Sequence, residues 1–86
     1  MSANSIERAS AAADPAVVEV AREWLLICKN DFGEWPDVTA HELAALAPSL
    51  VVVAVDRLWG GGLSGFLDDS AAEIADRRAA RNATDF

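Results

Sequence analysis

The chain has few of the residues on which protein chemistry most often depends. Its 86 residues include one cysteine, one histidine and no tyrosine. The single cysteine, Cys28, has no partner for an internal disulfide, which fits a reducing compartment, so we expect a cytoplasmic protein. The single histidine, His41, has no cysteine or carboxylate at the spacing of a metal site. The sequence therefore predicts no metal, no cofactor and no enzymatic activity.

Long apolar runs and basic residues are also scarce. No stretch approaches the roughly 18 uncharged apolar residues of a membrane-spanning helix. Glu7 and Arg8 stand where a signal peptide would be hydrophobic, so we expect neither membrane insertion nor export. Seven lysines and arginines against fourteen acids give a net charge of −7. That charge repels a phosphate backbone and argues against a nucleic-acid partner.

Apolar residues are plentiful by contrast, at 52% of the chain, which is too many for a disordered protein. The patterns below predict an all-α fold, a compact bundle of about four helices. Residues 1–13 are small and polar, with Ile6 as the one large apolar side chain, and are expected to form a flexible, disordered arm. Residues 14–82 are expected to form a single helical domain, and residues 83–86 a C-terminal tail.

The first predicted helix begins at Asp14-Pro15, an N-cap carboxylate followed by a proline at the first helical position, and runs to about Lys29. Its apolar stripe recurs at helical spacing, at Val17, Val20, Ala21, Trp24, Leu25 and Cys28. Cys28 on this stripe is expected to pack in the core rather than to react.

The second predicted helix has the clearest start in the chain. Thr39 and Glu42 have the spacing of a capping box, and Val38 with Leu43 has that of a hydrophobic staple. Helix 40–47 should therefore begin at Ala40, and Pro48 should end it after about two turns.

The run Leu50 to Val55 suits a buried strand as well as a buried helix, because it is rich in β-branched residues. No other segment offers a strand to pair with it, so a helix framed by Pro48 and Gly60 is the better interpretation. Its core face is predicted to hold Val51, Val52, Val55, Leu58 and Trp59. Leu50 and Val53 fall on the opposite face, before Asp56 and Arg57, and a helix that is apolar nearly all round is expected to be central or to contact a partner.

Residues 60–65 match G-x-G-x-x-G, the dinucleotide-binding pattern. We reject that interpretation, because residues 56–59 separate the glycines from the apolar run and no second strand follows. A sharp turn is expected instead, after which Ser64 caps a last helix with Leu63, Phe66, Leu67, Ala71 and Ile74 on its apolar side. Arg77, Arg78 and Arg81 near its end suit the helix dipole.

Four residues are the candidates for partner binding: Trp35, Leu50, Val53 and Arg57. Trp35 lies in a loop between Gly33 and Pro36, where it either plugs the end of the core or anchors a partner, as exposed aromatic residues do. Leu50 and Val53 are the apolar excess of the third helix. Arg57 is the one base on the face that would meet DNA if residues 39–58 formed a helix-turn-helix unit, which is the alternative interpretation.

Part of the chain resembles a pattern in small helical proteins of actinobacteria and their phages. The pattern consists here of Val55-Asp56, Trp59, Gly61-Gly62-Leu63 and Phe66-Leu67, with Gly60 as an additional glycine. The resemblance covers about residues 50–69 and implies a phage or host accessory factor without an assigned activity. We therefore expect a non-enzymatic protein that binds a protein partner or a second copy of itself, as in a homodimer.

Overall fold

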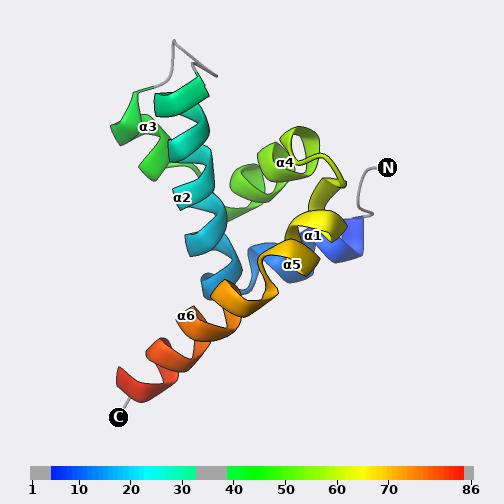
Figure 1. Cartoon of the computed structure of the whole chain (residues 1–86), viewed down its shortest axis with the longest axis vertical. Helices are drawn as coiled ribbons and strands as arrows, with labels where there is room; N and C mark the ends of the chain where they lie inside the picture. The colour runs from blue at the N-terminus through cyan, green and yellow to red at the C-terminus, as the bar shows by residue number, and fades with distance from the viewer. Residues whose placement is uncertain (1–4, 33–38, 85–86) are drawn as a thin grey trace.

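The computed structural model of the chain describes residues 5–32 and 39–84. These residues form an all-α structure of six helices (Figure 1). The helices are α1 Ser5–Ala12, α2 Pro15–Phe32, α3 Ala40–Ala44, α4 Pro48–Leu58, α5 Gly62–Asp69 and α6 Ala71–Thr84. The predicted all-α class is confirmed, and the helix count is higher than the expected four because of α1 and because the last predicted helix is divided.

Helix α2 is the central element of the fold. It contacts α3 on one side and α4 on the other, and α6 packs along its N-terminal half (Figure 1). The Asp14 carboxylate accepts a hydrogen bond from the Ala16 backbone N–H at 3.1 Å, as a helix N-cap does. The predicted stripe is buried in the core, except for Trp24, which is half-buried.

Helix α3 begins as its capping box predicts. The Glu42 N–H donates to the Thr39 hydroxyl at 3.0 Å, and the Thr39 N–H donates to the Glu42 carboxylate at 3.2 Å. Leu43 is buried, while its predicted staple partner Val38 lies outside the described residues. The Arg22 guanidinium of α2 donates hydrogen bonds to the backbone carbonyl of Leu43, in α3, and to that of Leu46, just beyond α3. These bonds attach the end of α3 to α2.

The ambiguous run of residues 50–55 is helical and lies within α4. Val51, Val52 and Val55 are almost completely buried, because α4 packs against α1, α2 and α5. Helical pairing satisfies its backbone groups within the segment itself, which a lone strand could not do. Trp59 follows the helix as its C-cap residue and is half-buried.

Residues 5–12 form helix α1, in the segment for which the sequence predicted a flexible arm over residues 1–13. The expectation rested on Ile6, which is 78% exposed, whereas the residue that α1 buries is Ala11. Alanine has the highest helix propensity, and its small side chain lets α1 lie close against α4 and α2. Small residues that looked uninformative in the sequence thus make a close helix contact.

The last predicted helix is two helices, α5 and α6, separated at Ser70. Ser64 does not cap it, because α5 already begins at Gly62, and the predicted N-cap is therefore wrong. The turn does need a glycine: Gly62 has a φ of 70°, in the left-handed region. Leu63, Phe66 and Ile74 are buried as predicted, whereas Ala71 is exposed because the chain changes direction at Ser70.

Candidate functional site

One face of α4 is exposed and apolar. Leu50 is 54% exposed and Val53 is 38% exposed, although Val51, Val52 and Val55 of the same helix are buried. Arg57 is exposed as well and forms no ion pair with any residue that the structure describes. Positions i, i+3 and i+7 lie on one side of an α-helix, so these three side chains form a row, which we call the α4 face.

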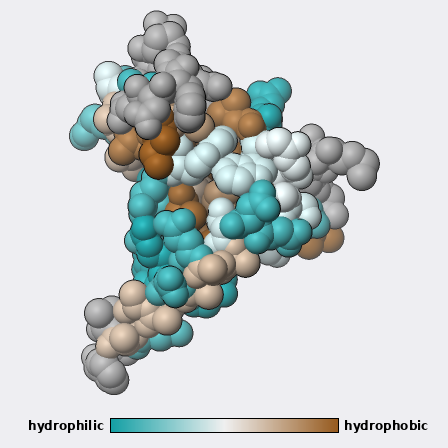
Figure 2. Space-filling view, viewed as in Figure 1, coloured by the Kyte–Doolittle hydropathy of each residue, from teal (hydrophilic) through white to brown (hydrophobic). Residues whose placement is uncertain are grey.

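The α4 face gathers three of the four residues predicted from the sequence to contact a partner. The fourth, Trp35, lies outside the described residues. Figure 2 shows apolar surface over part of α4, hydrophilic surface along the lower part of α2, and mixed surface along α6. The α4 face is therefore set apart from the most polar side of the molecule.

Asp56 does not lie where the apolar pattern of its helix predicted. It was expected on the solvent side of its helix, but it is 8% exposed. Its carboxylate accepts a hydrogen bond from the Leu63 N–H at 2.9 Å and lies 3.8 Å from the Arg8 guanidinium. Asp56 thus caps α5 from the preceding helix and joins α1 to α4. No local sequence pattern predicts this role, because both partners of Asp56 lie on other helices.

Three aromatic side chains pack in a row beside α4, with Trp59 between Trp24 and Phe66. The ring centroid of Trp59 lies 4.9 Å from that of Trp24 and 5.2 Å from that of Phe66, both in edge-on geometry. The indole N–H of Trp59 donates to Asp69 at 3.1 Å. A Cβ at Gly65 would lie 3.4 Å from the Trp59 ring, so the absence of a side chain at Gly65 leaves room for that ring. These contacts give Trp24 and Trp59 the packing role that was expected of them.

Ion pairs attach α6 to α2. Arg77 binds Glu19 and Glu23 of α2 and lies 3.4 Å from Glu73 of its own helix. Arg81 approaches Glu19 at 3.3 Å. The hydrogen bond from Arg77 is the main cause that holds the pKa of Glu23 below its ordinary value, and it outweighs partial burial. The two glutamates in turn raise the pKa of Arg77.

A further ion pair links α6 to the start of α2. Burial alone would raise the pKa of Asp14, but the hydrogen bonds from Arg78 and from the Ala16 N–H outweigh it, so that this pKa is lowered. The arginine cluster that the sequence placed near the end of the chain therefore serves tertiary structure. It attaches α6 along α2.

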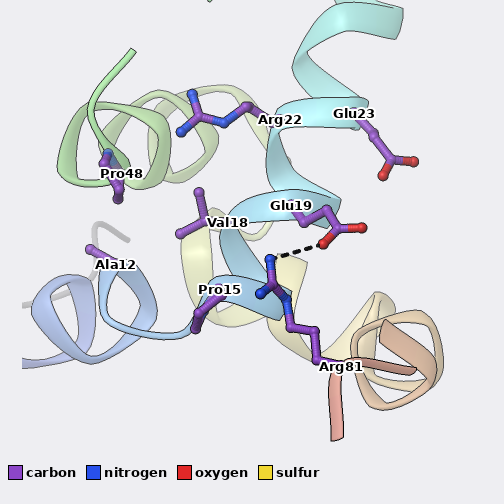
Figure 3. Close-up of a pocket in the computed structure, with 8 residues that line it drawn as sticks. All are labelled: Ala12, Pro15, Val18, Glu19, Arg22, Glu23, Pro48 and Arg81. Atoms are coloured by element: carbon purple, nitrogen blue, oxygen red, sulfur yellow. Dashed lines mark hydrogen bonds and ion pairs between the residues drawn. The ribbon is translucent and has the colours of Figure 1, made fainter. Parts of the chain in front are cut away.

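A groove of about 420 Å³ lies between α2, the end of α1, the start of α4 and α6. In Figure 3, Arg81 reaches between Pro15 and Glu19, and Glu23 points away from the other side chains. Arg22 is directed toward the segment joining α3 and α4, whose carbonyls it binds. Each charged side chain of this groove has a partner: Glu19 pairs with Arg81, Glu23 with Arg77, and Arg22 with backbone carbonyls.

No group of three or more histidine, cysteine or carboxylate side chains able to hold a metal ion occurs within residues 5–32 and 39–84. Cys28 is buried in α2. In the same residues no single helix has the length and apolar character of a membrane span; α4 and α5 together meet those criteria but are bent by 95°. Comparisons with protein-family models, with curated proteins and with solved structures give no match to this chain.

Proposed function

We propose that this chain is a small non-enzymatic accessory protein that binds another protein, a second copy of itself included, through the α4 face. The observation that carries the proposal is the exposure of Leu50 and Val53 on a helix whose other valines are buried. Exposed apolar side chains grouped on one helix are typical of interaction surfaces. Arg57 at the end of the row adds a charge that can orient a partner.

The alternative is a helix-turn-helix DNA-binding protein built from α3 and α4. In that arrangement α4 would enter the major groove, where side chains read base edges through hydrogen bonds. The α4 face has two apolar side chains and a single base, and the net charge of the chain is −7. These features favour a protein partner over DNA.

The proposal is tested by Val53→Asp, which puts a charge in the middle of the α4 face. Ala75→Asp is the control, because it adds the same charge to an exposed position of α6, outside the α4 face. Val52→Asp reports on burial, since Val52 is 1% exposed and a carboxylate there is expected to unfold the protein. Circular dichroism should show native helix content for the first two variants and a loss for the third.

Binding is then measured by light scattering for self-association and by pull-down from the native host, with each retained protein retested in purified form. We expect the association of the wild-type chain to persist in Ala75→Asp and to be lost in Val53→Asp. If Val53→Asp binds everything that the wild type binds, the α4 face is not the site. A sequence-specific gel shift of duplex DNA by the monomer would instead support the helix-turn-helix alternative.

A further inference from the structure

Helix α1 is attached to the rest of the fold by little apolar contact. Within the described residues of α1, Ala11 alone is buried, and Ile6 is 78% exposed. Two residues, Ala13 and Asp14, connect α1 to α2. An eight-residue helix is marginal on its own, so α1 depends on these few contacts for its order.

The side of α1 that faces α5 and α6 is incompletely packed. A hollow of about 350 Å³ lies there, lined by Ile6, Glu7 and Ser10 of α1 and, across from them, by Leu67 and Arg78. Helix α1 packs mainly against α4, which it contacts more extensively than α2. Displacing α1 would break few apolar contacts other than those with α4.

Asp56 marks the part of α4 against which α1 packs. The ion pair with Arg8 places α1 over the edge of α4 on which Asp56 lies. Val52 is four residues earlier, one turn away on the same edge, and is 1% exposed. Val53 is the next residue of the chain and belongs to the α4 face. Removal of α1 would therefore uncover the edge that adjoins that face.

We propose that α1 is a displaceable strap, latched by Arg8 onto Asp56, whose opening enlarges the α4 face from Leu50 and Val53 to include Val52. The need for a larger α4 face follows from the area of a typical protein interface. Each partner buries roughly 800 Å² in a standard protein interface, far more than two partly exposed side chains supply. The regulatory use of the strap rests on the proposed function, but its opening is a property of the isolated chain.

Helix α6 provides an internal comparison. It is attached to α2 by the ion pairs of Arg77 and Arg81 and by the buried side chain of Ile74. Two helices at opposite ends of the chain thus differ in how firmly they are held. We therefore expect α1 to open locally more often than the unit formed by α2 and α6.

The strap is tested by hydrogen–deuterium exchange of the full chain, read by mass spectrometry helix by helix. The amides of α1 should exchange faster than those of α2 in the wild type. In Arg8→Gln the exchange of α1 should accelerate about tenfold while that of α2 stays unchanged, as local opening requires. Arg8→Lys should restore slow exchange, since it keeps the charge. Arg57→Gln is the matched control, because it removes one exposed arginine charge from α4 and should leave α1 unaffected.

Exchange of α1 as slow as that of α2, or equal acceleration of both helices in Arg8→Gln, would overturn the strap. The two proposals fail separately. If α1 opens but Val53→Asp binds normally, the strap stands and the proposed function fails. If α1 does not open but Val53→Asp abolishes binding, only the strap is wrong.

Discussion

Gly62 is the position where substitution by alanine should destabilise this fold through the backbone. Its φ of 70° lies in the left-handed region, which costs a residue with a Cβ about 1–2 kcal/mol. Gly62 is the first residue of α5 and is followed by Leu63, whose N–H binds Asp56. A change of φ would therefore move the N–H that Asp56 caps. We expect Gly62→Ala to lower the free energy of unfolding by about 1–2 kcal/mol.

The two preceding glycines are matched controls with different surroundings. A Cβ at Gly60 would meet no atom within 4 Å, so Gly60→Ala should be neutral or raise stability by up to about 1 kcal/mol, by restricting the unfolded chain. A Cβ at Gly61 would lie 3.1 Å from the backbone Cα of Gly65, which is too close without a small shift. Gly61→Ala should therefore be destabilising, for a steric rather than a conformational reason.

The assay is thermal unfolding followed by circular dichroism at the helix minimum. In a domain of this size, 1 kcal/mol shifts the melting temperature by roughly 4–8 °C. Gly62→Ala should therefore melt about 4–16 °C below the wild type, and Gly62→Val lower still. If Gly62→Ala melts at or above the wild type, or if Gly60→Ala is the more damaging change, the positive φ does not constrain the turn.

Three further predictions concern the capping and charged contacts. Thr39→Ala removes one half of the capping box and should lower the free energy of unfolding by about 1 kcal/mol, and an unchanged melting temperature would contradict this. Asp56→Ala removes a buried acceptor and should cost about 1–3 kcal/mol, whereas Asp56→Asn, which keeps an acceptor for the α5 N–H, should cost less in the same melt. The lowered pKa values of Asp14 and Glu23 stabilise the fold above the ordinary carboxylate pKa of about 4, and this stabilisation should disappear as the pH falls through the lowered values. Melting temperatures measured from pH 6 to 2 should fall less steeply when Arg77 and Arg78 are both glutamine.

Local patterns predicted the helices whose signals lie within a few residues. The Asp14-Pro15 start and the capping box at Thr39 appear in the structure, whereas α3 ends at Ala44, earlier than the expected end at Pro48. These signals are reliable because each describes how one helix end satisfies its own backbone groups. The exposure of Leu50 and Val53 followed from helical periodicity, although their binding role stays a proposal.

Contacts between distant segments could not be predicted in the same way. The order of α1 depends on Ala11 fitting against α4 and on Arg8 reaching Asp56, 48 positions away along the chain. The sequence offers no local sign of such a pairing, since an acid near a helix end usually faces water. The break at Ser70 is likewise absent from the apolar pattern, which continues across it.

The sequence by itself determined the all-α class, the starts of α2, α3 and α4, and the excess of apolar residues in α4, because these follow from local hydrogen bonding and from periodicity. Only the tertiary structure decided that Asp56 is buried and caps α5, that the arginines of α6 bind α2, and that α1 packs against α4. The reason is physical. A side chain that satisfies a group on another helix can be recognised only when the packing of the two helices is known.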